Sequence, residues 1–228
     1  MDIEKMIKGT EGFSIKLLSD RIYKVIREKI IYGEFSPGEH IVELEIAKMF
    51  STSQAPVREA FSRLQKEGLL VSIPYKGNFV YQLDEEEVKE IFRLRYMVEK
   101  MAVEAMFERW DNKHSQALHE IMIKMDDAAR SNMLTDTVEA DLAFHRYICC
   151  NASDYNNIIN AWEMWVGKIS LLITNYDKKL VEDESLDITL QHHRAIYDAF
   201  NSGDKDVLLN AFEQHWSLIL SSNLQTDQ

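Results

Sequence analysis

The sequence predicts a mainly α-helical protein in two parts, because both the predicted elements and the charge change near residue 83. Residues 15–82 contain three helical patterns followed by a β-hairpin signal, whereas residues 84–222 contain helical patterns without a strand signal. A chain of 228 residues with 46% hydrophobic residues is long enough for two compact cores. We therefore expect one small helix-and-hairpin domain over residues 15–82 and an antiparallel six-helix bundle over residues 84–222.

The first part begins with an amphipathic helix that ends near Gly33, a residue type that favours helix termination. Its apolar stripe consists of Leu18, Ile22, Val25, Ile26 and Ile30. Pro37 and Gly38 predict a turn, and residues 43–50 predict a short second helix. This order places two helices and a turn before the segment that follows.

A third helix is predicted after Ser53, which can cap it, and it ends at Gly68. Its buried stripe consists of Val57, Ala60, Phe61 and Leu64. Two short β-prone runs then flank residues 74–78, which is typical of a hairpin. Helices followed by such a hairpin are the order of a winged helix-turn-helix.

The second part predicts six helices separated by polar breaks, which is the pattern of a helical bundle. The breaks lie near residues 111–113, 131–135, 153–154, 177–185 and 202–204.

The net charge of −12 alone argues against nucleic-acid binding, because phosphate contacts need basic residues. The average is misleading, however. Residues 15–82 carry ten Lys and Arg against eight Asp and Glu, a net +2, whereas residues 83–228 carry fourteen against twenty-seven, a net −13. Only the first part is therefore suited to contact DNA.

The adjacent Cys149 and Cys150 are poorly placed to pair with each other, and no spacing indicates a disulfide framework. The chain also contains no apolar run long enough to span a bilayer and no secretion signal. We expect a soluble, cytoplasmic protein.

Several stretches of the chain resemble the GntR family, in its FadR-like branch with an FCD effector domain. In the first part these are GEFSPGEHI, SQAPVREAFSRLQKEGLL and IPYKGNFV; in the second they are EIFRLRYMVEKMAVEAM, DLAFH and HHRAIYDAF. The helix count suits the six-helix, VanR-like variant. The resemblance implies a homodimeric, ligand-responsive transcriptional regulator, commonly a repressor, that binds operator DNA and is not an enzyme.

The first turns of a recognition helix face the major groove, where an arginine can bridge O6 and N7 of guanine. The candidates here are Ser51, Ser53, Gln54 and Arg58. The resemblance implies DNA contacts for Ser53 and Arg58. Gln54 departs from the usual arginine of the family, and glutamine prefers adenine.

Four further residues are candidate DNA contacts. Arg63 either contacts phosphate or forms an ion pair with Glu59 or Glu67. In the predicted hairpin, Lys76, Gly77 and Asn78 are placed to reach the minor groove or phosphates, although an isolated turn lysine is usually only solvated.

Asp141 and His145 fall on the apolar stripe of one helix at i, i+4 spacing, and His193 and His215 fall on the stripes of the last two helices. Such groups are costly to bury unless they are paired or liganded. The resemblance implies that these four residues bind one divalent metal, commonly Zn²⁺. Two alternatives stay open: the four residues hydrogen-bond one another, or they form the site of a metal-dependent hydrolase.

Arg95 also falls on an apolar stripe, where a guanidinium can hold a carboxylate by two hydrogen bonds. We predict that it binds a small organic-acid effector. An i, i+4 ion pair with Glu99 is the equally weighted alternative.

Overall fold

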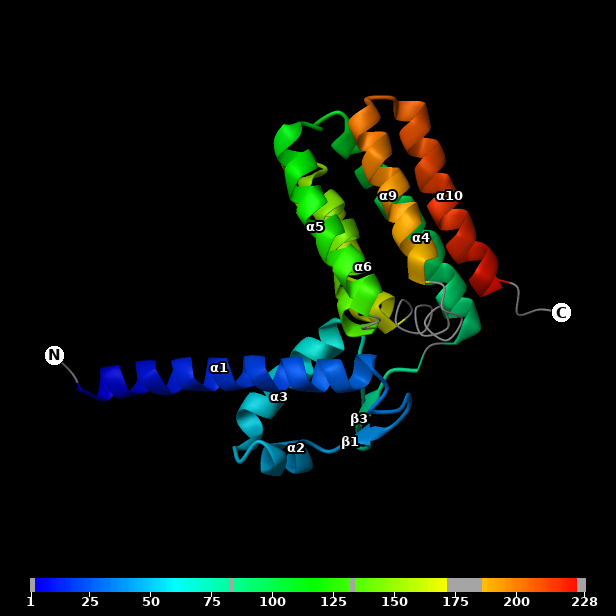
Figure 1. The fold of residues 1–228 in the computed structure, drawn as a ribbon. Coiled ribbons are helices and arrows are strands. Elements are labelled where there is room, and N and C mark those ends of the chain that lie inside the picture. The colour runs from blue at the N-terminus through cyan, green and yellow to red at the C-terminus, as the bar shows by residue number, and fades with distance from the viewer. Residues whose placement is uncertain (1–2, 83, 132–133, 172–185, 225–228) are drawn as a thin grey trace. The chain divides into compact units, whose positions relative to one another are not determined.

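The computed structural model describes residues 3–82, 84–131, 134–171 and 186–224. The chain divides into two compact units, Met1–Leu83 and Asp84–Gln228. The protein is mainly helical, with one small sheet in the first unit, which confirms the predicted fold class (Figure 1).

The first unit contains three helices and a three-stranded antiparallel sheet of order β1-β3-β2. In chain order the elements are α1 (Ile3–Ile31), β1 (His40–Ile41), α2 (Glu43–Met49), α3 (Gln54–Lys66), β2 (Leu70–Ile73) and β3 (Gly77–Val80). Helix α3 packs against α1, α2 and β2. The predicted stripes of α1 and α3 meet in this core, where Ile22, Ile26, Val57 and Leu64 are completely buried.

The described structure adds two features to the sequence prediction for this unit. Helix α1 begins at Ile3, well before its predicted apolar stripe. The segment after the Pro37-Gly38 turn forms β1, which pairs His40 with Phe79 and Ile41 with Asn78 of β3. Strand β1 thus ties the hairpin to the chain that leads into α2.

The second unit is a bundle in which α4 packs against α6, α7 and α10, and α5 packs against α6 and α9 (Figure 1). The described helices are α4 (Glu85–Phe107), α5 (Asn112–Ser131), α6 (Leu134–Asn151), α7 (Asn157–Glu163), α9 (Leu186–Ser202) and α10 (Lys205–Leu224), with residues 166–171 also helical. The fourth predicted helix is thus interrupted at Met164 and Trp165. The predicted break near residues 177–185 lies outside the described residues.

Large aromatic side chains fill the centre of the bundle. Phe144, Trp162, Phe200, Phe212 and Trp216 are each no more than 1% exposed. Of these, Phe144 lies against His145 and His193, Trp216 lies against His215, and Trp162 donates a hydrogen bond to Glu99. Among the described helices, none is both long and apolar enough to cross a bilayer.

Candidate metal centre and DNA-binding surface

Three helices bring the predicted polar residues together inside the bundle. Asp141 and His145 lie one turn apart on α6, His193 lies on α9 and His215 lies on α10. Their side chains point inward because each occupies a core position of its helical stripe, and the four residues are between 0% and 5% exposed. The neighbouring His192 is only half-buried, so His193 is the member of this pair that faces the cluster.

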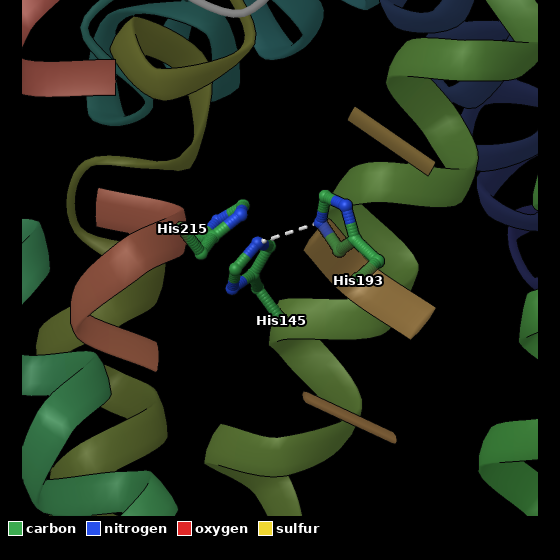
Figure 2. Close-up of side chains that lie close together, drawn as sticks. All are labelled: His145, His193 and His215. Carbon is green, nitrogen blue, oxygen red and sulfur yellow. Dashed lines mark hydrogen bonds between the residues drawn. The ribbon is translucent and has the colours of Figure 1, made fainter. Parts of the chain in front are cut away.

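The three imidazoles converge on one point, and one nitrogen of each lies within 4.8 Å of the other two (Figure 2). His145 Nε2 is 3.1 Å from His193 Nε2. The carboxylate of Asp141 joins this group, since its Oδ1 lies 3.1 Å from His193 Nε2 and 3.8 Å from His145 Nε2. We refer to Asp141, His145, His193 and His215 as the Asp-His cluster.

A second layer of buried groups supports the cluster from α4 and α7. Glu99 lies 2.8 Å from His145 Nδ1 through Oε2, and its Oε1 accepts hydrogen bonds from Arg95 Nε at 2.6 Å and Trp162 Nε1 at 2.8 Å. Arg95 Nη2 lies 3.5 Å from Asp141 Oδ2. The i, i+4 ion pair considered for Arg95 is therefore present, and it is buried.

The charges of this layer control the protonation of both carboxylates. Burial alone would raise the pKa of Glu99, but the positive charge and hydrogen bond of Arg95, together with the adjacent ring of His145, outweigh it and lower the pKa to about 2. Burial likewise opposes ionisation of Asp141, yet His145, His193 and Arg95 together lower its pKa. Both groups therefore remain carboxylates at neutral pH.

His215 differs from these carboxylates, because burial and the neighbouring His193 and His145 lower its pKa well below the ordinary value of histidine. It is therefore neutral at pH 7 and offers a nitrogen lone pair. Its Nε2 is buried and has no hydrogen-bond partner among the described residues. A neutral imidazole with an unused nitrogen is the form that a metal ion binds.

The cluster fits a divalent metal in both chemistry and spacing. Nitrogen and oxygen ligands at about 2.1 Å from a tetrahedral ion lie about 3.4 Å from one another. The separations of 3.1 and 3.8 Å among Asp141, His145 and His193 are close to this value, and a nitrogen of His215 lies within 4.8 Å of the other two imidazoles. The same separations also permit hydrogen bonds among Asp141, His145 and His193, so these distances support both of the interpretations drawn from the sequence.

The first unit presents a polar face on α3. Arg58 is exposed on the side of the helix opposite its buried stripe and has no ion-pair partner within the described part of the chain. Gln54 is the first residue of α3, and Ser53 precedes it as the N-cap residue. Ser51 has a φ of 50° in the turn between α2 and α3. These four residues therefore lie together at the beginning of α3.

Arg63 also lies on α3, but its guanidinium is engaged within the unit. It pairs with Asp20 of α1 and lies 3.8 Å over the ring of Tyr23. Neither Glu59 nor Glu67 is its partner; Glu67 instead accepts hydrogen bonds from Tyr23 and Arg27. The ion pair considered from the sequence, with Glu59 or Glu67, is wrong, because the partner of Arg63 comes from α1 and not from α3.

The hairpin of β2 and β3 presents two different kinds of polar residue. Lys76 is exposed at its tip, next to the fully exposed Tyr75. Gly77 has a φ of 104°, and a Cβ atom there would lie only 2.5 Å from His40 Nε2. The positive φ therefore favours glycine at this position, and any side chain there would also displace the ring of His40.

Asn78 is 8% exposed, and its side chain accepts a hydrogen bond from Gln65 at 2.8 Å and donates one to Glu43 at 3.4 Å. The side chain of Asn78 is therefore used inside the unit, which differs from the expected contact with DNA. It links β3 to α2 and α3.

Two family models match the chain. "Bacterial regulatory proteins, gntR family" matches residues 18–80, and "FCD domain" matches residues 90–218, more than half of the chain. The chain belongs to the GntR family. The first unit is its winged helix-turn-helix, and the second unit carries its FCD domain.

Curated relatives match almost the whole length of this GntR-family chain. The "Probable D-xylose utilization operon transcriptional repressor" of Paenarthrobacter nicotinovorans is 26% identical, with 92% of this chain and 90% of that protein covered. The "HTH-type transcriptional repressor RspR" of Escherichia coli (strain K12) is 27% identical, with 100% and 96% covered. This chain is thus a transcriptional regulator, and the metalloenzyme alternative is set aside.

Solved structures share the fold. "E. coli McbR/YncC" has a TM-score of 0.73 at 18% identity, and a "putative transcriptional regulator GntR from Rhodococcus sp. RHA1" has a TM-score of 0.74 at 22% identity. Each comparison covers 92% of this chain and 99% of the other. These two proteins therefore share the fold of this chain.

Proposed function

We propose that this GntR-family regulator is a homodimeric repressor whose FCD domain binds one divalent metal, Zn²⁺, and a small carboxylate effector. Operator DNA is bound by the winged helix, in the cytoplasm. The observation that carries the proposal is that one chain contains both an exposed arginine near the start of α3, Arg58, and a buried Asp-His cluster in its second unit. Two relatives that are named repressors support the sign of regulation.

DNA recognition is proposed to rest on the beginning of α3. Arg58 is exposed and has no ion-pair partner in the described residues, so its guanidinium can make two hydrogen bonds to guanine. Gln54 is placed to read an adjacent base, and Ser51 and Ser53 are placed to contact phosphates. Lys76 at the tip of the hairpin adds a phosphate or minor-groove contact, for which Gly77 and Asn78 hold the hairpin in place.

Arg63 is proposed to contribute differently from Arg58. Its ion pair with Asp20 is partly exposed, with side-chain exposures of 40% and 41%, so the guanidinium can still approach a phosphate. We propose a homodimer because the interface between one winged helix and DNA offers too few base contacts for regulatory affinity. Two copies would recognise a pseudo-palindromic operator.

The metal is proposed to be held by Asp141, His145, His193 and His215. Four polar residues on inward faces are costly to desolvate, and a shared ion compensates them together. Three neutral imidazoles and one carboxylate leave a divalent ion with a net positive charge, which attracts an anion. When bound, the metal would supply an electrophilic anchor for an effector carboxylate.

Arg95 is proposed to assist effector binding. Its Nη2 is buried, faces Asp141 Oδ2 at 3.5 Å and makes no hydrogen bond to the described residues. An anion near the metal would provide this missing acceptor. Effector binding would then change the placement of the two winged helices in the dimer and shift operator affinity by the difference in effector affinity between the two arrangements.

The DNA part of the proposal is tested with Arg58→Ala in an operator titration. Loss of a bidentate base contact should weaken specific binding by about 1–3 kcal/mol. Arg130→Ala is the matched control, because it removes an exposed arginine from the FCD domain. Equal affinities for both variants would refute the assignment of α3 as the recognition helix.

The metal part is tested by elemental analysis of protein purified without chelator. We expect about one equivalent of zinc, less in His193→Ala and His215→Ala, with operator binding retained because the winged helix has its own core. If the purified protein contains no stoichiometric metal and takes up none at neutral pH, the cluster is a hydrogen-bonded network instead.

A further inference from the structure

Glu99 is a buried acidic residue of the FCD domain that is not one of the four proposed metal ligands. It is 1% exposed on α4, the helix that follows the winged helix-turn-helix in the chain. Its two oxygens are used differently. Oε1 accepts hydrogen bonds from Arg95 Nε and Trp162 Nε1, whereas Oε2 lies 2.8 Å from His145 Nδ1.

The opposite nitrogen of the His145 ring faces the centre of the Asp-His cluster. His145 Nε2 lies 3.1 Å from His193 Nε2 and 3.8 Å from Asp141 Oδ1. One ring of His145 therefore connects the carboxylate of Glu99 on one side with the proposed metal position on the other.

A neutral imidazole carries one N–H and one lone pair, and its surroundings decide which nitrogen carries the proton. An ionised carboxylate can only accept hydrogen bonds. Oε2 makes no hydrogen bond to any other described residue, so the nitrogen 2.8 Å away is the one favoured to carry the proton, which leaves the lone pair on Nε2. This is the tautomer in which His145 can bind a metal at the centre of the cluster.

We propose that Glu99 is the positioning residue that fixes His145 as the Nδ1–H tautomer and thereby prepares Nε2 to bind the metal. This inference rests on the proposed function of the cluster. Glu99 does not itself touch the metal position; it acts through the ring of His145.

The surroundings of Glu99 are built to keep it ionised. Arg95 supplies a buried positive charge and Trp162 supplies an N–H that can only donate. Because both donors use Oε1, Oε2 is left for His145.

Glu99→Gln is a near-isosteric test of this arrangement. The amide oxygen can still accept from Arg95 and Trp162, so the NH₂ group takes the place of Oε2 next to His145 Nδ1. An NH₂ group donates, so the ring is driven to the opposite tautomer, with its N–H directed at the metal position. The substitution should thus oppose metal binding while changing the shape of the core very little.

Trp162→Phe is the matched control. It removes a different hydrogen bond to the same glutamate, on Oε1, and leaves the contact between Oε2 and His145 in place. Any general loosening of the core around Glu99 should appear in this variant as well. An effect on the tautomer should not.

The first experiment is long-range ¹H–¹⁵N NMR of the metal-free, full-length protein at alkaline pH, where imidazole is neutral. The His145 signals are assigned by their absence in His145→Gln. We expect the Nδ1–H tautomer in the wild type and in Trp162→Phe, and the Nε2–H tautomer in Glu99→Gln. An Nε2–H tautomer in the wild type would overturn the inference whether or not the variants fold.

The second experiment is zinc affinity measured by competition with a chelator. Loss of a carboxylate that orients a histidine ligand typically weakens metal binding about 10- to 100-fold. We expect a loss of zinc affinity of that size for Glu99→Gln. For Trp162→Phe we expect a loss below about 3-fold, because the contact between Glu99 and His145 is kept. Equal zinc affinities for the wild type and Glu99→Gln would overturn the role of Glu99.

The two experiments separate the inference from the proposed function. A wild type with the Nδ1–H tautomer that takes up no zinc would refute the metal site and leave the link between Glu99 and His145 standing. A wild type that binds zinc but holds His145 as the Nε2–H tautomer without metal would refute only the role of Glu99.

Discussion

Replacing Arg95 with methionine should destabilise the FCD domain by several kcal/mol. Arg95 is 4% exposed and compensates two buried carboxylates, Glu99 at 2.6 Å and Asp141 at 3.5 Å. With an effective dielectric constant of about 20, two unit charges 3.5 Å apart attract each other by about 5 kcal/mol. Part of this is recovered when the remaining carboxylates take up protons, so we expect a loss of about 3–5 kcal/mol.

Arg146→Met provides the matched control. Arg146 Nη2 and Glu163 Oε1 are also 2.6 Å apart, but the two side chains are 56% and 41% exposed. Water screens such a pair, so its loss should change stability by about 0–1 kcal/mol. The two variants thus differ in burial and not in the length of the ion pair.

The assay is urea unfolding followed by tryptophan fluorescence, with a chelator present so that metal does not contribute to stability. All four tryptophans lie after residue 83, so the signal reports the FCD domain alone. A loss below about 1 kcal/mol in Arg95→Met, or equal losses in the two variants, would refute the view that this buried network depends on its single guanidinium.

Four further outcomes are expected in the winged helix. Gln54→Arg should shift the preferred base at one symmetric operator position toward guanine, and a binding-site selection that returns the same consensus would contradict this. Asn78→Ala should lower the stability of the unit by about 0.5–1.5 kcal/mol because the buried Asn78 side chain no longer bonds the half-buried Gln65 and Glu43, whereas Lys76→Ala should leave stability unchanged and reduce the salt dependence of DNA binding. Burial and the hydrogen bond to Glu67 raise the pKa of Tyr23 from 10.0 to about 12, so the folded unit holds this proton more tightly than the unfolded chain. The stability it contributes is complete below pH 10 and is lost as the pH rises to 12; an alkaline unfolding profile of Tyr23→Phe that is identical to the wild type would count against this.

Local periodicity was sufficient to predict the helices and the inward direction of the cluster residues. A helix repeats every 3.6 residues, so a polar residue within an apolar stripe can be recognised without knowing what the stripe packs against. Asp141 and His145 were identified in this way on one helix, as were His193 and His215 on two others. That three imidazoles meet within 4.8 Å was an expectation from the family resemblance, and the bundle brings it about.

Short elements and long-range partners could not be predicted from the sequence. Strand β1 has two residues, too few to show an alternating pattern. The pairing of Arg63 with Asp20 joins residues 43 positions apart, and nothing in the local sequence distinguishes Asp20 from the nearer Glu59 and Glu67. Only the packing of α3 on α1 decides between them.

Glu99 illustrates the same division at the site itself. Its spacing from Arg95 along α4 made an ion pair one of two equally weighted alternatives for Arg95, because residues four apart share a helix face. His145 lies 46 residues farther along the chain and Trp162 lies 63 residues farther, so neither contact follows from the helical repeat. The sequence therefore determined that Arg95 lies on the apolar face of α4 and left its pairing with Glu99 open. The packing of α6 and α7 against that face decided that the pair supports a histidine of the cluster, since burial among three helices limits each oxygen of Glu99 to the donors that those helices supply.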